Sequence, residues 1–183
     1  MNGAPERVLE QLSPSSGAAT RPLHLRLSRR GERPGPAVLG VACVSGGASY
    51  GRGADPDEWR PASVGIPVSA GDRLYTARGS RLELHAEEFE IHLGPGTGLE
   101  AIDLGVDAVS FSVWGGALSF HVRQLRPGDR FGVETPNAAV AFESVGVYEI
   151  DVGTVGKTSV VVRSGSARVS SAGVAKPFGP AGV

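Results

Sequence analysis

Two histidines and two glutamates are the residues in this chain whose spacing best suits chemistry. The apolar residues alternate on both sides of Ala-Glu-Glu, which predicts a hairpin of two strands. His85 and His92 would then face outward beside Glu83 and Glu90, where imidazoles and carboxylates can hold a divalent metal. The spacing matches no known metal motif, and exposed strands often carry such polar pairs. We therefore predict no metal and keep the pair His85 and His92, with a small hydrolase or metal enzyme, as the alternative.

Five further residues are candidates for binding. The loop "GRGADPDEW" carries Asp55, Asp57 and Glu58, and carboxylates of this kind can bind calcium. A calcium loop needs oxygen ligands at several alternating positions, so a solvated acidic turn is the expected structure. Tyr50 and Tyr75 could stand on a sugar-binding face, because sugar sites use exposed aromatic rings beside carboxylates or amides.

No catalytic cluster is recognisable. The serines of "VSGGAS" are not followed by a helix, as an exposed nucleophile requires. The segment "GPGTG" has no lysine and opens no helix, which excludes a phosphate loop. Cys43 lies in an apolar run and is expected to be a buried, inert thiol. His121, between Phe120 and Val122, is expected to face solvent. We predict a non-enzymatic protein without a cofactor.

The composition favours a β-rich globular domain. The chain has 183 residues, of which 40% are hydrophobic, so it can bury a core. It contains 27 Gly and 13 Pro, which predicts many turns and short strands. The net charge of −1 gives no basis for binding nucleic acid or a membrane surface. No apolar stretch is long enough to span a membrane, and no signal peptide is recognisable. The single cysteine excludes an intramolecular disulfide.

Three segments are predicted along the chain. Residues 1–36, with six Arg and three Glu, form a flexible basic N-terminal segment. Residues 37–174 carry short strands at intervals of about 8–12 residues, which indicates an all-β domain, solenoid-like or sandwich-like. Residues 175–183 form a C-terminal tail. The aromatic residues expected in the core are Trp59, Trp114, Phe111 and Phe120.

The turn "TPN" at 135–137 separates two predicted strands in which apolar and polar residues alternate regularly. Pro136 fixes φ and removes a backbone donor, which suits a corner between strands. Asn137 tolerates turn conformations. Val133, Ala138, Val140 and Phe142 would line the interior, and the turn is interpreted as a scaffold corner and not as a site.

Five segments, in this order, resemble the FecR family of bacterial extracytoplasmic domains. They cover about residues 41–170 and read "EWRPASVGIPVSAGDRLYTARGSRLELH" after "VSGGASY", then "FEIHLGPGTGLE", "WGGALSFHVRQL", "RFGVETPNAAVAF" and "GVYEIDVGTVGKTSVVVRSGSARV". The resemblance implies an all-β domain without a catalytic site. The best-known members of the family span the inner membrane and carry a periplasmic signal to a sigma factor.

The chain departs from those regulators. It shows no transmembrane helix, no sigma-binding segment and no second α/β domain, and it resembles the stand-alone secreted or periplasmic members. We therefore predict a binding or signalling module of the bacterial cell envelope that recognises a protein or peptide. The alternative is an envelope domain that binds polysaccharide or is purely structural. The resemblance implies a periplasmic location, and a cytoplasmic one is the alternative because no leader is seen.

Overall fold

The computed structural model describes residues 38–53, 58–153, 157–171 and 174–179. The chain divides into two units, and all described residues belong to the second, Arg33–Val183. Every regular element in these ranges is a β-strand, which confirms the all-β prediction. None of the described residues forms a helix that could cross a membrane.

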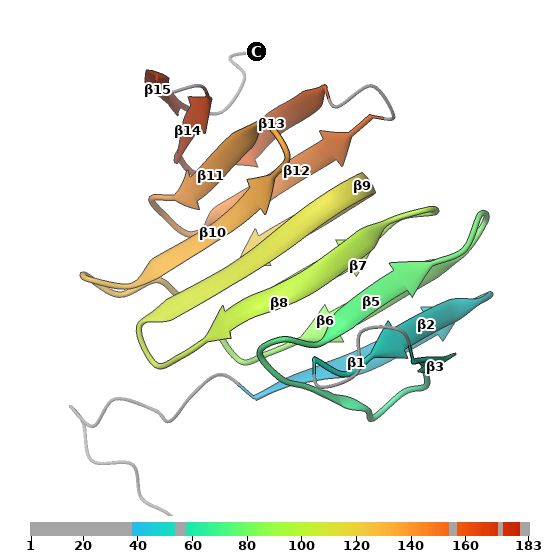
Figure 1. Ribbon diagram of the computed structural model, residues 1–183. Coiled ribbons are helices and arrows are strands. Elements are labelled where there is room, and N and C mark those ends of the chain that lie inside the picture. The colour runs from blue at the N-terminus through green and yellow to red at the C-terminus, as the bar shows by residue number, and fades with distance from the viewer. Residues whose placement is uncertain (1–37, 54–57, 154–156, 172–173, 180–183) are drawn as a thin grey trace, which may run out of the picture. The chain divides into compact units, whose positions relative to one another are not determined.

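The strands form one continuous sheet that folds over into two facing layers (Figure 1). Layer 1 contains, in spatial order, β4 (Pro67–Val68), β1 (Leu39–Ser45), β6 (Arg81–His85), β7 (Phe89–Leu93), the second half of β9 (Ala108–Val122), β12 (Gly146–Val152) and β13 (Thr158–Ser164). Layer 2 contains β3 (Trp59–Pro61), β2 (Ala48–Gly51), β5 (Arg73–Thr76), β8 (Gly98–Leu104), the first half of β9, β10 (Arg130–Thr135), β11 (Ala138–Phe142), β14 (Ala167–Ser171) and β15 (Val174–Phe178).

Strand β9 belongs to both layers and joins them. Its first half pairs with β8 and with β10, the latter in the one parallel pair of the described strands. Its second half pairs with β7 and β12. The change occurs at Gly116, where φ is +84° and a Cβ would lie 2.5 Å from the Cα of Thr97. Glycine tolerates a positive φ and has no Cβ that could clash with Thr97. We call Gly116 the pivot, because the chain passes there from layer 2 to layer 1.

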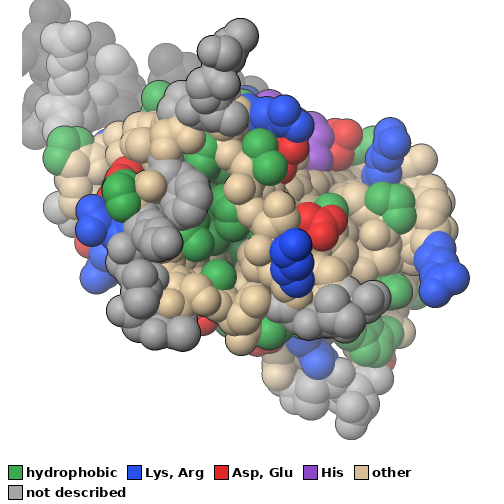
Figure 2. Space-filling model, turned by 90° about the horizontal axis from the view of Figure 1, so that it is seen from above, with side chains coloured by type: hydrophobic (Ala, Val, Ile, Leu, Met, Phe, Trp, Pro, Cys, Tyr) green, Lys and Arg blue, Asp and Glu red, His purple; other side chains and the backbone are tan. Residues whose placement is uncertain are grey.

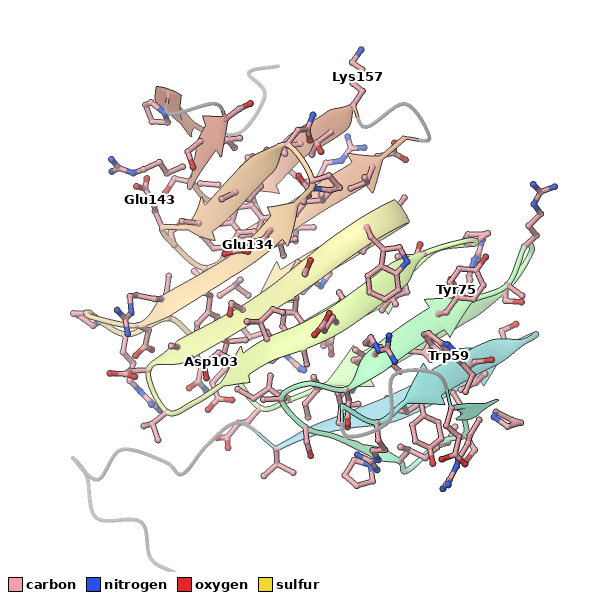
Figure 3. All side chains as sticks on the ribbon, viewed as in Figure 1. Trp59, Tyr75, Asp103, Glu134, Glu143 and Lys157 are labelled. Carbon is pink, nitrogen blue, oxygen red and sulfur yellow. The ribbon has the colours of Figure 1, made fainter. Side chains whose placement is uncertain are left out.

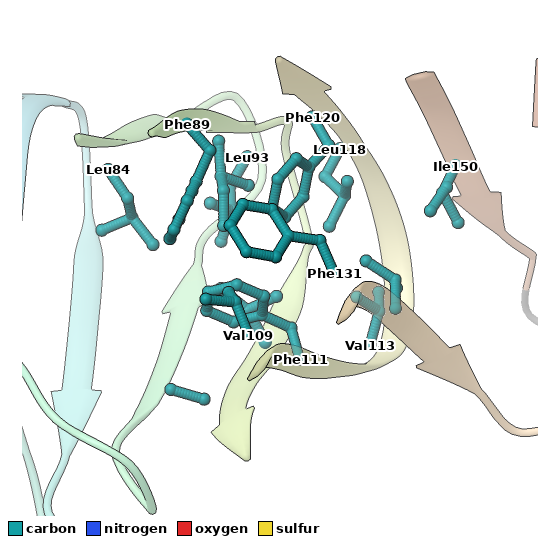
Figure 4. Close-up of a cluster of buried hydrophobic side chains, with 14 of the residues drawn as sticks. Leu84, Phe89, Leu93, Val109, Phe111, Val113, Leu118, Phe120, Phe131 and Ile150 are labelled. Atoms are coloured by element: carbon teal, nitrogen blue, oxygen red, sulfur yellow. The ribbon is translucent and has the colours of Figure 1, made fainter. Parts of the chain in front are cut away.

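Aromatic side chains fill the space between the layers (Figure 4). Phe89 of β7 meets Phe111 of β9 and Phe131 of β10, with ring centroids 5.9 and 5.7 Å apart. Further along, Phe142 of layer 2 stacks on Tyr148 of layer 1 at 4.4 Å. Edge-on and offset contacts of this kind add to the hydrophobic gain of burial. The predicted core positions Phe111 and Phe120 are confirmed, with both side chains fully buried.

The two predicted core tryptophans lie elsewhere. Trp59 and Trp114 are 42% and 43% exposed, so their assignment to the core was wrong. In β9 the interior positions of the first half are Val109, Phe111 and Val113, which puts Trp114 on the opposite face. Trp114 lies at the end of a strand segment with alternating apolar residues, but its side chain points to the face opposite the buried ones.

Cys43 is exposed, so the prediction of a buried thiol was also wrong. The register of β1 against β6 shifts between Val41 and Cys43, which marks a β-bulge. Leu39 and Val41 point inward before the bulge, while Cys43 pairs with Glu83 on the outer side. One extra residue in a strand turns every following side chain to the opposite face of the sheet. The sequence "VLGVACVSG" contains no residue that would predict this bulge.

The turn at 135–137 is a corner, as the sequence predicts. Val133, Val140 and Phe142 are buried on either side of it. The hydroxyl of Thr158, at the start of β13, lies 2.9 Å from Oγ1 of Thr135 and 2.5 Å from Oδ1 of Asn137. The turn thereby ties β10 and β11 of layer 2 to β13 of layer 1.

The strand pattern continues beyond the predicted end of the domain at residue 174. Strand β15, Val174–Phe178, pairs with β14 along its whole length. The predicted C-terminal tail therefore contains an edge strand. The predicted N-terminal segment 1–36 lies outside the described residues.

Candidate functional site

Tyr50 and Tyr75 lie on opposite sides of layer 2. Tyr50 pairs with the buried Leu74, and its half-buried ring packs against the core. Tyr75 pairs with Ser49 and is 41% exposed on the outer face. The guanidinium of Arg52 sits 5.3 Å from the centre of the Tyr50 ring. The two tyrosines do not form one platform.

The predicted acidic loop is represented by Glu58 alone, because Asp55 and Asp57 lie outside the described residues. Glu58 is exposed, and its Oε1 accepts hydrogen bonds from Nε and Nη2 of Arg60 at 2.9 and 2.6 Å. The hydrogen bond with Glu58, more than its charge, raises the pKa of Arg60 further above its usual value. This carboxylate is therefore already paired at the surface.

The predicted histidine and glutamate hairpin has the expected geometry. Strands β6 and β7 pair so that Glu83 lies opposite His92, and His85 lies opposite Glu90. All four side chains face away from the core. The adjacent strand β9 brings His121 opposite Glu90. These five residues form what we call the histidine patch, and Figure 2 shows histidine side chains beside acidic and basic ones.

A hollow of about 500 Å³ lies next to this patch on the outer face of layer 1. Its floor is low because small residues occupy the centre of the layer, at Gly94, Ala117 and Ser119. Longer side chains stand around it on four strands, and those that project outward are Arg81, Glu83, His92, Glu149, Asp151 and Val161.

The rim of the hollow is acidic. Its charged groups are the carboxylates of Glu83, Glu149 and Asp151 and the guanidinium of Arg81. Glu149 is paired with Arg163 through two hydrogen bonds of 3.0 and 2.9 Å. The hydrogen bonds from Arg163 hold the pKa of Glu149 below its usual value, so it is ionised at neutral pH. The rim therefore favours a cationic ligand.

The hollow extends to β13, which forms an edge of layer 1. Within the described part of the chain β13 pairs with β12 and with no other strand. The other three layer edges are β3, β4 and β15, and each contains a proline, at Pro61, Pro67 and Pro177. Proline at a sheet edge prevents a further strand from adding. Strand β13 has seven residues, "TSVVVRS", without proline and with one charge, so it is the edge best suited to accept a strand.

The outer face of layer 2 carries a band of exposed aromatic rings, which we call the aromatic band: Trp59, Tyr75 and Trp114. Figure 3 labels Trp59 and Tyr75. A Cβ on Gly98 would lie 2.0 Å from Cε2 of Trp114, so this indole rests on the Gly98 backbone. Tyr75 is the cross-strand partner of Gly98 and stands beside it.

Comparisons with known proteins give a likeness of fold. No protein-family model matches the chain, and no curated protein matches it. Two crystal structures of candidate anti-sigma factors from Parabacteroides distasonis superpose on it, each with a TM-score of 0.53. The sequences are 20% and 19% identical, and the match covers 59% of this chain. The chain corresponds to about half, 51%, of each of those proteins. The shared feature is the all-β architecture.

The sequence correctly predicted that His121 faces away from the core, between the buried Phe120 and Val122. It did not predict the hollow, the free edge at β13 or the position of His121 opposite Glu90. Each depends on pairing between distant segments, such as β7 with β9 and β9 with β12. One signal was present in the sequence. The run "TSVVVRS" has neither proline nor a central charge, which distinguishes it from the other edge strands.

Proposed function

We propose that this domain is a non-enzymatic module that binds an extended segment of a partner protein at β13. The observation that carries the proposal is the combination of one proline-free edge strand with a hollow that begins at its outer face. A peptide that adds to a sheet edge gains affinity from main-chain hydrogen bonds and specificity from pockets that receive alternate side chains. The hollow supplies such a pocket.

The charge of the rim specifies the partner segment. Three carboxylates and one guanidinium surround the hollow. Arg163 pairs with Glu149, so the carboxylates of Glu83 and Asp151 carry the acidic character of the rim. A lysine or arginine of the partner would place its charge among the carboxylates and its aliphatic stem against Val161. The preferred ligand is therefore an extended, basic peptide segment.

The likeness to candidate anti-sigma factors supports a signalling role, because anti-sigma factors act by binding other proteins. The FecR resemblance supports the same role and a location in the bacterial cell envelope. Both features fit a module that presents a rigid β scaffold to a partner, and neither requires a catalytic group. The function we propose is recognition of a protein in a signalling process outside the cytoplasm.

Selection of peptides tests the proposal. Peptides from a random display library are selected on the purified full chain, and their affinities are measured by fluorescence polarisation. We expect enrichment of Lys and Arg and a loss of affinity of at least about fivefold in Asp151→Lys. The matched control is Glu134→Lys, the same charge reversal on the outer face of layer 2, which should bind as the unmodified chain does. Equal affinity for both variants would refute the site.

The aromatic band supports a second candidate, the binding of envelope polysaccharide. Exposed rings of Trp59, Tyr75 and Trp114 stand on one face, and sugar rings stack on such surfaces. Retention of the full chain on insoluble peptidoglycan, lost in Trp114→Ala and kept in Asp151→Lys, would support it. No retention on peptidoglycan or on other insoluble polysaccharides would remove it.

A further inference from the structure

The two carboxylate oxygens of Glu90 have different neighbours. Oε1 lies 2.8 Å from Nη2 of Arg123 and 3.4 Å from Nε2 of His85. Oε2 faces two imidazoles, with Nε2 of His92 at 3.7 Å and Nδ1 of His121 at 3.8 Å. Both of the latter distances exceed the length of a hydrogen bond. Oε1 is thus held by a cation, while Oε2 is directed at two nitrogens without bonding to either.

His92 provides a second, independent observation. Its Nε2 atom is buried and has no hydrogen-bond partner among the described residues, although its side chain is 43% exposed overall. A buried polar atom without a partner carries a desolvation penalty. This nitrogen lies on the side of the ring that faces Glu90. In the tautomer protonated at Nδ1, the lone pair of Nε2 can bind a ligand at that point.

From these contacts we propose a site for a divalent transition metal, bound by Nε2 of His92, Nδ1 of His121 and Oε2 of Glu90. Glu90 and His92 are two apart on β7, so they share the outer face. His121 of β9 lies opposite Glu90. Two imidazoles and a carboxylate are ligands that suit Zn²⁺, Co²⁺ and Ni²⁺, whereas Mg²⁺ and Ca²⁺ prefer oxygen alone.

The distances agree with this ligand set after a small movement. A tetrahedral zinc ion with bonds of about 2.0–2.2 Å holds its ligand atoms about 3.3–3.6 Å apart. The nitrogens of His92 and His121 lie 3.7 and 3.8 Å from Oε2 of Glu90, and the two ring centroids are 5.7 Å apart. As the side chains stand, no three His, Cys, Asp or Glu residues in the described ranges are arranged to hold a metal. To bind the metal, each of the two nitrogens would move a few tenths of an ångström closer to Oε2 of Glu90.

Arg123 has a supporting role in this site. Its guanidinium holds Oε1 of Glu90 at 2.8 Å and so fixes the orientation of the carboxylate, whereas His85 stands 3.4 Å from the same oxygen and forms no hydrogen bond with it. Partners of this kind orient the ligands of protein metal sites. The guanidinium also adds a positive charge nearby, which lowers the affinity for a cation, so we expect a dissociation constant in the micromolar range and not below it.

Titration of the metal-free full chain with Zn²⁺ tests the inference. Isothermal titration calorimetry should show one equivalent bound, and His92→Gln, His121→Gln and Glu90→Gln should each weaken binding at least tenfold. The matched control is His85→Gln, which removes an imidazole that contacts Oε1 and should change affinity less than threefold. The absence of binding by the unmodified chain at 100 µM Zn²⁺, or an equal loss in His85→Gln, would overturn the ligand set.

A second measurement needs no variant and covers the case in which a variant fails to fold. Diethylpyrocarbonate modifies imidazoles that are free, and mass spectrometry locates the modified residues. Zn²⁺ should protect His92 and His121 and leave His85 reactive, and uniform reactivity with and without Zn²⁺ would refute the site. This inference is separate from peptide binding at β13, which can be measured in the presence of a chelator.

Discussion

The backbone N–H of Thr97 donates a hydrogen bond of 2.9 Å to Oγ1 of Thr76, and both residues are fully buried. The Thr76 hydroxyl donates in turn to the carbonyl of Gly94 at 2.6 Å. Oγ1 of Thr97 accepts from the N–H of Ala117 at 3.0 Å. These threonines come from the segments "GDRLYT" and "GPGTG", which carry the resemblance to the FecR family. The two motifs therefore hold β5, β8 and β9 together and are structural.

Replacement of Thr97 by valine should test this role. Val has nearly the same shape but no hydroxyl, so the buried N–H of Ala117 and carbonyl of Gly94 lose a partner. We expect a loss of about 1–3 kcal/mol in the free energy of unfolding, measured by urea denaturation. Thr97→Ser keeps the hydroxyl and is the control. A Thr97→Val protein as stable as Thr97→Ser would contradict the role of the hydrogen bonds.

Two neighbouring glycines of β9, Gly115 and Gly116, allow a matched test of the pivot at Gly116. Gly116→Ala places a Cβ 2.5 Å from the Thr97 Cα at a φ of +84°, so it should destabilise the domain by at least about 1–3 kcal/mol. At Gly115 an added Cβ has no heavy atom within 4 Å, and Gly115→Ala should change the unfolding free energy little. Thermal denaturation followed by circular dichroism compares the two, and equal melting temperatures would contradict the pivot.

The exposed position of Cys43 predicts a reactive thiol in the folded protein. Ellman's reagent at pH 8 should react with one thiol per chain without denaturant, because Cys43 is the single cysteine and is exposed. The Cys43→Ser variant should give no signal. Reaction that begins only after denaturant is added would show that the bulge in β1 is misplaced.

The Glu149 and Arg163 pair predicts a dependence of stability on pH. The pKa of Glu149 is lowered from 4.5 by the hydrogen bonds from Arg163, so the ionised form is favoured in the folded state. The pair therefore stabilises the fold above about pH 4.5 and loses this effect as pH falls through the lowered pKa. At pH 7, Glu149→Gln should melt up to about 2 °C below the unmodified chain.

The difference between these two proteins should disappear at the lowest pH at which both still fold, since the carboxyl is then protonated in the unmodified chain as well. Asp151→Asn, at a carboxylate that no arginine contacts in the described structure, is the control for the loss of one surface charge at pH 7. A difference for Glu149→Gln that is the same at both pH values would contradict the role of the ion pair.

Local alternation was sufficient to predict much of the fold. It placed Glu83, His85, Glu90 and His92 on one outer face, because side chains alternate with a period of two in any strand. It failed at Cys43, where a bulge shifts the phase, and the rule that aromatic residues lie in the core failed at Trp114. The alternation of side chains is a property of each strand alone. The position of a bulge, and which face of the strand is buried, depend on the strand that pairs with it.

Contacts between distant strands could not be predicted in this way. The site inferred at Glu90 depends on His121, which lies 31 positions later in the chain and arrives through the pairing of β7 with β9. The hollow likewise needs five strands, β6, β7, β9, β12 and β13, from three regions of the sequence. Such pairings are decided by the packing of the whole core, so a single sequence shows the residues and not their neighbours.

Amide hydrogen exchange tests the central claim, that a partner segment adds to the sheet at β13. The exchange of Thr158–Ser164 is measured by mass spectrometry in the full chain, with and without a saturating amount of a peptide selected as above. We predict that the peptide slows exchange in β13, because its free edge acquires hydrogen-bond partners, and leaves β3 and β15 unchanged. Slower exchange at β3 or β15, with β13 unaffected by a peptide that binds tightly, would contradict the account.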